Sequence, residues 1–253
     1  MNSRKFYEDH KNFSHRTLHE YYISPGIKCK FDLLKEHINP ESFFLNGIDL
    51  GCSGNSFLYF LENIANKSFF DLARFPLKQY TSQEHWHPVC GDIVKLPYQD
   101  ETFDLVSALD VLEHVKNDDV AISEISRIIK KGGIAILTVP HEMRYYTSQD
   151  RLIGHYRRYE IDRLTSLFKK YDFRCVDIFG VYGQMMRIAD VQSINPQKTE
   201  RNLIRLRNRY TTSVLFRSFW NIFVRISAKM MKIDAKYQPR KKVMNIAFIF
   251  KKL

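Results

Sequence analysis

The chain has 253 residues, 44% of them hydrophobic, and a formal net charge of +11. This length permits one large α/β domain with an insertion, and no apolar run approaches the roughly 18 residues of a membrane-spanning helix. The charged stretch after Met1 lacks the apolar segment of a secretion signal, and the scattered cysteines form no C-x-x-C pair. We therefore expect a reduced, cytoplasmic protein.

The positive charge is concentrated near the end of the sequence. Residues 198–253 hold fifteen Lys or Arg and only two acidic residues, Glu200 and Asp234, so residues 1–197 carry 24 basic and 26 acidic residues. Such asymmetry is typical of a segment that meets an anionic partner, either nucleic acid or an acidic membrane surface.

Strand and helix patterns alternate along most of the chain. Residues 1–40 predict an N-terminal helical segment, with a helix over Phe31–His37 that stops at Asn39-Pro40. Further helices are expected over Ser56–Ile64, Val120–Ile129 and Glu160–Tyr171, and Lys130-Lys131-Gly132-Gly133 is expected to end the second of these. Strands are expected at Gly47–Leu50, Ser68–Asp71, a segment ending at Cys90–Ile93, Phe103–Asp110, Ile134–Val139, Phe173–Val181 and Asn245–Lys252.

This alternation predicts an α/β fold with a doubly wound, Rossmann-like parallel sheet of about seven strands. Residues 41–197 would form the core and residues 241–253 its final strand. Residues 198–240 would be a basic helical insertion before that last strand.

Three turns at the ends of predicted strands share a regular spacing. The glycine turn in Gly47–Ser56 is followed by Asp71, and Asp71 by Asp92, each about twenty residues later. Either aspartate alone is more typical of a strand-end cap. Three such turns, however, favour a nucleoside cofactor at the carboxyl ends of parallel strands.

The turn also indicates which kind of nucleoside would bind. It lacks the spacing G-x-G-x-x-G and the lysine of a P-loop, which favours a cofactor without a pyrophosphate. We expect Asp71 to accept hydrogen bonds from ribose hydroxyls and Asp92 from the adenine amine. Ile93 would give the adenine ring an apolar wall.

The run from Asp49 to Val115 resembles a class I S-adenosylmethionine-dependent methyltransferase of the small-molecule type. The segments that carry the resemblance are Gly91-Asp92, Leu96-Pro97-Tyr98, Phe103-Asp104-Leu105-Val106 and Leu112-Glu113-His114-Val115. The similarity extends over about residues 44–181, and Gly154–Tyr159 resembles bacterial and archaeal members linked to glycan assembly.

The resemblance implies S-adenosylmethionine as the cofactor and a set of residues that hold it. Asp71 and Leu72 would bracket the ribose, and Asp92 and Ile93 the adenine. Leu109 and Asp110 would lie beside the sulfonium, and the methionine part would face Asp49, Gly51, Cys52, Ser53, Gly54 and Asn55. The family usually has glycine at the positions of Ser53 and Asn55, and Asn tolerates positive φ better than most residues.

Methyl transfer from a sulfonium needs a base only when the acceptor is a weak acid such as a hydroxyl. The candidates are His114, His141 and His155, with His114 closest to the end of the fourth predicted strand. For His114 the alternative is a structural hydrogen bond. His155, together with Arg157 and Arg158, could bind an anionic acceptor, or all three could form a solvated surface.

No metal site is predicted. His85 and His87 have the spacing of metal ligands, but no nearby cysteine or acidic cluster completes a site.

The basic segment allows several interpretations. Over 214–233, bulky apolar residues share a helical pattern with Arg217, Arg225, Lys229 and Lys232, as in a helix that lies on an anionic membrane. The alternative is a helix that covers the sheet or the acceptor pocket. Four arginines could instead contact a phosphate backbone; they are Arg201, Arg205, Arg207 and Arg209.

The sequence thus predicts an enzyme that transfers a methyl group to an oxygen or nitrogen of a small-molecule, lipid-linked or glycan-linked acceptor. If the basic segment contacts a membrane, the protein would be peripheral on its inner face. Two alternatives remain. One is a methyltransferase of tRNA or rRNA that uses the basic segment, and the other is a non-catalytic protein with a methyltransferase-like fold. The oligomeric state is not predicted.

Overall fold

The structure is a computed structural model that describes residues 3–9, 16–39, 41–81, 83–186 and 196–253. The predicted helix stop at Pro40 and the stretch 187–195 near the end of the predicted core lie outside the described residues. Within the described residues, no helix is both long enough and apolar enough to cross a membrane.

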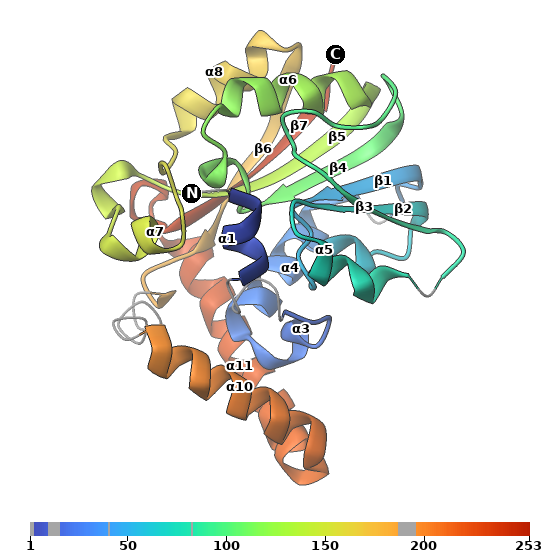
Figure 1. Ribbon diagram of the computed structural model, residues 1–253. Helices are drawn as coiled ribbons and strands as arrows, with labels where there is room; N and C mark the ends of the chain where they lie inside the picture. Colours follow the sequence, from blue (N-terminus) through green and yellow to red (C-terminus); the bar gives the residue numbers. More distant parts are fainter. Residues whose placement is uncertain (1–2, 10–15, 40, 82, 187–195) are drawn as a thin grey trace.

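The centre of the molecule is a seven-stranded sheet in the order β3-β2-β1-β4-β5-β7-β6 (Figure 1). All pairs from β3 to β5 are parallel, whereas β7 runs antiparallel to both β5 and β6. The strands are β1 (Phe44–Leu50), β2 (Ile64–Asp71), β3 (Trp86–Cys90), β4 (Phe103–Leu109), β5 (Ile129–Pro140), β6 (Phe173–Tyr182) and β7 (Asn245–Lys252). The predicted doubly wound sheet is confirmed, with β7 as one antiparallel member.

Helices cover both faces of this sheet (Figure 1). They are α1 (Ser3–Asp9), α3 (Glu20–Ile23), α4 (Pro25–His37), α5 (Arg74–Leu77), α6 (Asp118–Ile128), α7 (Ser148–Leu152), α8 (Ile161–Lys170), α10 (Pro196–Thr212) and α11 (Val214–Tyr237). Short 3₁₀ turns are η1 (Phe57–Phe60), η2 (Lys78–Tyr80), η3 (Leu112–His114), η4 (Met143–Tyr145) and η5 (Arg240–Lys242). The helical insertion, α10 and α11, precedes β7 as predicted.

Two apolar cores lie on opposite faces of the sheet because strand side chains alternate in direction. Val106 in β4 and Phe248 in β7 pack against α6 and α8, in a core that also contains Phe168. The neighbouring Leu105 and Ala247 point to the other face, toward the core formed with α4 and α5. The continuous apolar sequence of β4 and β7 therefore reflects burial on both faces.

Two predicted elements are wrong. The segment Ser56–Ile64 is not a helix, because only η1 forms there and Ile64 already pairs with Phe44 as the first residue of β2. Lys130–Gly133 does not end a helix. These residues lie inside β5, at a register shift between the pairs Phe103–Ile129 and Leu105–Ile134.

The order of the strands creates a crevice in the middle of the sheet. The chain adds β2 and then β3 on one side of β1, and it then returns to add β4 on the opposite side of β1. Open α/β sheets bind ligands at such a change of direction, beyond the carboxyl ends of the strands. A cavity of about 730 Å³ lies there, a volume typical of a small-molecule site.

Candidate functional site

The turn after β1 is fixed by hydrogen bonds to neighbouring strands. The backbone amides of Gly51 and Cys52 donate to the Phe70 carbonyl at 2.8 and 3.1 Å. Asp49 is buried beneath the turn and accepts from Ser107 Oγ at 2.5 Å, from Ser56 Oγ at 2.6 Å and from the amide of residue 57 at 3.2 Å. The Asp49 side chain therefore holds the turn, and its predicted contact with a cofactor remains a prediction.

Two residues of this turn adopt a left-handed backbone. Gly51 has φ +70°, and a Cβ there would lie 2.5 Å from the Val111 side chain. Ser53 has φ +50°. The non-glycine residue with a positive φ is thus Ser53 and not Asn55. The buried Oδ1 of Asn55 has no hydrogen-bond partner within the part of the chain that the structure describes.

The remaining turn residues differ in what they contact. Cys52, Ser53 and Asn55 line the cavity. Gly54 instead packs against the Arg16 backbone, where a Cβ would lie 1.8 Å from the carbonyl oxygen. Only a glycine fits at this close approach.

Asp71 connects the ends of β1 and β2 at the cavity wall. Its Oδ2 accepts from the Ser53 amide and its Oδ1 from the Ala73 amide, both at 2.8 Å. Burial raises the pKa of Asp71, while these backbone hydrogen bonds act in the opposite direction. A carboxylate has about four acceptor positions, so two remain for a ligand such as a diol. Leu72 lines the cavity next to it.

Asp92 and Ile93 follow β3 and also line the cavity. Asp92 is exposed, and its Oδ1 accepts from the Val94 amide at 3.2 Å. Ile93 is only 8% exposed and packs into the core on the α6 side. Both residues thus lie at the cavity, and their contacts with an adenine remain a prediction.

Asp110 follows Leu109 at the end of β4 and binds a lysine that the sequence analysis did not identify. Its carboxylate forms an ion pair with Lys30 of α4 and accepts from Thr138 Oγ1 at 2.9 Å and from Asn245 Nδ2 at 2.7 Å. Burial alone would raise the pKa of Asp110, but the charge and hydrogen bond of Lys30 lower it to about 2. Asp110 itself has φ +55°.

Glu113 lies deeper than any other carboxyl group of the cavity wall. It is 0% exposed, and neither of its side-chain oxygens has a hydrogen-bond partner among the described residues. Burial and the nearby charge of Asp110 raise the pKa of Glu113 well above its ordinary value. The sequence analysis quoted Glu113 within a motif but gave it no role.

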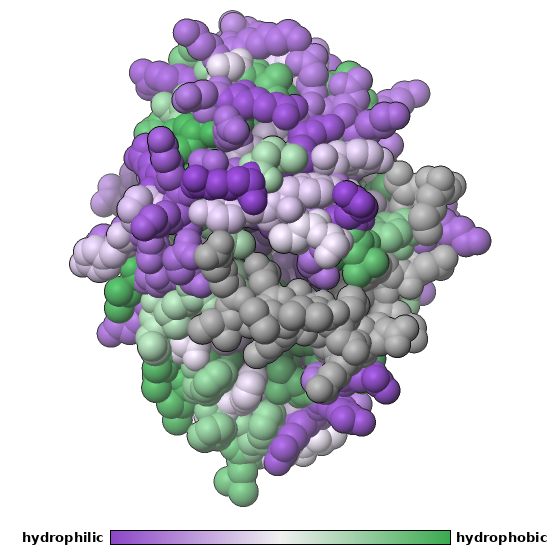
Figure 2. Space-filling view, turned by 90° about the vertical axis from the view of Figure 1, so that its left-hand side faces the viewer, coloured by the Kyte–Doolittle hydropathy of each residue, from purple (hydrophilic) through white to green (hydrophobic). Residues whose placement is uncertain are grey.

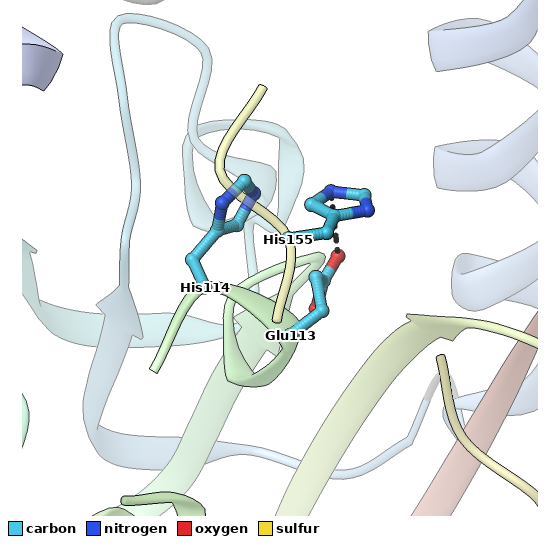
Figure 3. Close-up of side chains that lie close together, drawn as sticks. All are labelled: Glu113, His114 and His155. Atoms are coloured by element: carbon cyan, nitrogen blue, oxygen red, sulfur yellow. Dashed lines mark ion pairs between the residues drawn. The ribbon is translucent and has the colours of Figure 1, made fainter. Parts of the chain in front are cut away.

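His114 and His155, the two predicted bases, come together beside Glu113 (Figure 3). Their rings are 4.5 Å apart at an angle of 76°. His114 Nδ1 lies 2.9 Å from the Tyr7 hydroxyl, and burial together with His155 lowers the pKa of His114 to about 3. A histidine with so low a pKa stays neutral near pH 7 and is a weak proton acceptor, whereas a neutral imidazole can still bind a metal ion.

His155 is oriented by a buried acid. Its Nδ1 lies 2.7 Å from Asp150 Oδ1, and Asp150 is itself held by Arg158. Because a carboxylate only accepts, Nδ1 must donate, which leaves the lone pair on Nε2 in the neutral ring. Nε2 lies 3.8 Å from Glu113 Oε1.

Three other predicted residues lie elsewhere. His141 is buried with its Nδ1 2.8 Å from the Tyr159 carbonyl, and it does not line the cavity. Arg157 pairs with Asp118, as Arg158 does with Asp150. These guanidinium groups are engaged inside the protein and do not form the predicted site for an anionic acceptor.

Several cavity residues come from segments that the sequence analysis left without a function. They are Tyr7, Arg16, Lys30, Tyr156, Tyr182 and Asn245. They belong to the N-terminal segment, the loop before α8 and the last two strands, which only the folded chain brings together. No local spacing could have identified them.

The helical insertion has one buried face and one exposed face. Val224, Ala228 and Ala235 of α11 are buried, and Trp220 Nε1 donates to the Ile23 carbonyl at 3.0 Å. The exposed apolar stripe of α11 consists of Leu215, Phe219, Ile222, Ile226, Met230 and Ile233. Figure 2 shows hydrophobic side chains over the lower part of the molecule, at the height of α10 and α11 in Figure 1. The helix thus packs against the domain as one alternative predicts, and also presents an apolar surface.

Comparisons with known proteins show which proteins the cavity-forming segment resembles. A family model described as a methyltransferase domain matches residues 48–137. An uncharacterized protein of Methanocaldococcus jannaschii is 38% identical over 107 residues, 42% of this chain and 45% of that protein. A probable S-adenosylmethionine-dependent methyltransferase of Mycolicibacterium smegmatis is 27% identical over 94 residues, 36% of this chain and 37% of that protein. The chain spans less than half the length of these relatives.

Solved structures share the fold. Phosphoethanolamine N-methyltransferase 2 of Haemonchus contortus, in complex with S-adenosylmethionine, has a TM-score of 0.66 and 15% identity, over 100% of this chain and 60% of that chain. The segment matched by the family model, 48–137, contains the carboxyl ends of β1 to β4. The likeness therefore includes the part of the sheet that forms the cavity.

Proposed function

We propose that this chain, which belongs to the class I S-adenosylmethionine-dependent methyltransferases, binds S-adenosylmethionine in the cavity and transfers its methyl group. One observation carries the proposal. The side chains of Asp71 and Asp92, from neighbouring strand ends, line one cavity together with the Gly51 turn. This is the arrangement in which a parallel α/β sheet binds a nucleoside.

The charge of the cavity supports this cofactor. Five carboxyl groups line it, against three basic side chains. Burial raises the pKa of Glu113 and Asp110 is paired with Lys30, so Asp71 and Asp92 are the carboxyl groups best placed to attract a cation. S-adenosylmethionine carries a sulfonium and an ammonium group, so an acidic wall favours it electrostatically. Asp110 is the carboxylate at the end of β4, but its charge is compensated by Lys30, so we propose that it shapes the wall beside the sulfonium without supplying an unpaired negative charge.

The reaction is an in-line displacement. The acceptor oxygen or nitrogen forms a bond to the methyl carbon, the carbon–sulfur bond breaks, and its electron pair stays on sulfur as S-adenosylhomocysteine leaves. The proton of a hydroxyl acceptor passes to a base. Of the two predicted candidates, His114 and His155, we propose His155, because a pKa of about 3 makes His114 a weak base. The protein mainly aligns the two reactants and excludes water.

We also propose that the acceptor is lipid-linked and is reached at an anionic membrane surface. The apolar stripe of α11 includes Leu215, 86% exposed, and Phe219, 66% exposed. Arg225 and Lys229 are exposed at helical positions beside it, the pattern of a helix that lies in a membrane interface. The helix packs on β6, whose Tyr182 lines the cavity. The apolar stripe and the cavity therefore belong to one structural unit.

An RNA acceptor is less well supported. Arg207 forms an ion pair with Glu20 at 2.5 Å, and Arg209 lies over the Phe216 ring at 4.6 Å. Two of the four clustered arginines are thus engaged within the protein. Filter binding across salt concentration tests this alternative, since several phosphate contacts require a steep salt dependence.

Vesicle flotation tests the membrane proposal. We expect the protein to float with vesicles that contain phosphatidylglycerol and not with pure phosphatidylcholine, and the double variant Leu215→Ser/Phe219→Ser to lose this binding. Phe43→Ser is the matched control, because Phe43 is 70% exposed outside the helical insertion. Wild-type protein that stays unbound on anionic vesicles would overturn the proposal.

Transfer itself is tested with a labelled methyl donor. Protein incubated with methyl-labelled S-adenosylmethionine and a cell extract should release S-adenosylhomocysteine and carry label into the organic phase. Label that appears only in the aqueous phase would refute the lipid-linked acceptor but keep the methyltransferase. Cofactor binding without any release of S-adenosylhomocysteine would favour a non-catalytic protein.

A further inference from the structure

Glu113 is a buried carboxyl group with no hydrogen-bond partner. It is 0% exposed, both side-chain oxygens lack a partner among the described residues, and it lines the cavity. A buried polar group without a partner costs about 1–3 kcal/mol, and a charged one costs more. An unpartnered buried group in a native protein requires an explanation, and a bound ion is one of them.

The groups that face Glu113 are two imidazoles. One ligand atom from each of Glu113, His114 and His155 lies within 4.8 Å of the others (Figure 3). His155 Nε2 points at Glu113 Oε1 from 3.8 Å, too far for a hydrogen bond. At this separation the two groups form an ion pair if the imidazole is protonated, and a metal ion between them would bind both when it is neutral.

The surroundings of the cluster fix its geometry. Asp150 accepts from His155 Nδ1 at 2.7 Å and is held in turn by Arg158. A carboxylate behind a histidine is the usual way in which proteins orient a metal-binding imidazole. His114 is likewise held through Nδ1, 2.9 Å from the Tyr7 hydroxyl.

We infer that Glu113, His114 and His155 bind a divalent first-row transition-metal ion such as Zn²⁺ or Mn²⁺ on the acceptor side of the cavity. One carboxylate and two imidazoles suit such ions and leave coordination positions open. Asp110 is not a ligand in this site, because Lys30, Thr138 and Asn245 already occupy its carboxylate.

The inference deepens the proposed function, since an open coordination position would take an oxygen of the acceptor. It does not depend on transfer, because metal content is measured without cofactor. The two proposals can therefore fail separately: a chain that binds the ion but no S-adenosylmethionine refutes only the proposed function, and the reverse result refutes only the metal site.

Metal analysis of tag-free protein provides the test. After treatment with a chelator, the protein is loaded with Zn²⁺ or Mn²⁺, dialysed and analysed by mass spectrometry of the elements. We expect about one ion per chain for the wild type and at least roughly tenfold weaker binding for Glu113→Gln and His155→Gln. The control variants His85→Gln and His87→Gln replace exposed histidines and should retain the ion.

A spectrum of the wild type keeps the test decisive even if a variant does not fold. Pulsed electron paramagnetic resonance of the Mn²⁺-loaded protein should show coupling to imidazole nitrogen. Wild-type protein that retains no ion, a spectrum without nitrogen coupling, or loss of the ion only in His85→Gln or His87→Gln would overturn the inference.

Discussion

Lys30 of α4 and Asp110 at the end of β4 form an ion pair at the wall of the cavity. The lysine is buried and the aspartate is half-buried. The pair joins a helix near the start of the chain to the strand end beside which the sulfonium is expected. Loss of either partner should therefore change both the stability of the fold and the net charge of the cavity wall.

Removing the lysine should destabilise the protein. Lys30→Met leaves Asp110 without its counter-charge in a half-buried position, which costs about 1–3 kcal/mol. We expect a lower midpoint in urea denaturation. The double variant Lys30→Met/Asp110→Asn should recover much of the loss, because it removes the uncompensated charge. Equal midpoints for the wild type and Lys30→Met would contradict the role of this pair.

Asp49 should make stability fall as the pH rises. Burial raises the pKa of Asp49 to about 6 in the folded state, about two units above the value of an unfolded chain. The contribution of this group is therefore fully present below about pH 4 and is lost as the pH rises through about 6.

Asp49→Asn cannot ionise and serves as the comparison. Relative to this variant, wild-type protein should lose about 2–3 kcal/mol of unfolding free energy between pH 4 and pH 7. Urea denaturation at several pH values measures the difference. Asp162→Asn, at an exposed helix position, should keep the wild-type slope. Parallel profiles for the wild type and Asp49→Asn would show that Asp49 ionises normally.

Two glycines with similar positive φ allow the free-energy cost of backbone strain to be measured apart from the cost of a steric clash. Gly51 has φ +70° and Gly132 has φ +79°, but only at Gly51 would a Cβ meet a neighbour, 2.5 Å from Val111. Gly132→Ala should cost only the backbone penalty of about 1 kcal/mol. Gly51→Ala should cost clearly more and weaken cofactor binding. Equal losses in thermal unfolding would mean that the turn after β1 adapts freely.

Local patterns in the sequence predicted the sheet and the part of the cavity wall formed by the ends of β1 to β3. β4 and β7 are recognised by their continuous apolar residues, and Gly51, Asp71 and Asp92 by turns that directly follow strands. Such features depend on neighbours in the sequence. The Ser56–Ile64 helix was wrong because hydrogen bonds to Asp49 hold the chain in a short turn there.

The acceptor side could not be predicted in the same way. Lys30, Tyr7 and Asn245 reach the cavity from α4, α1 and β7, so their positions depend on the complete fold. The sequence indicates His114 as a candidate base because it lies close to the end of the fourth predicted strand. Its neighbour Glu113 is the more deeply buried group. The two adjacent residues alone cannot show which of their side chains faces the interior of the protein.

The binding of S-adenosylmethionine tests the central claim most directly. Isothermal titration of wild-type protein should show one site, Asp71→Ala should bind at least roughly tenfold more weakly because its ribose contact is lost, and Asp162→Ala should bind as the wild type does. No heat from the wild type at millimolar cofactor, or equal affinity of Asp71→Ala and wild type, would contradict an adenosyl group held at the ends of β1 and β2.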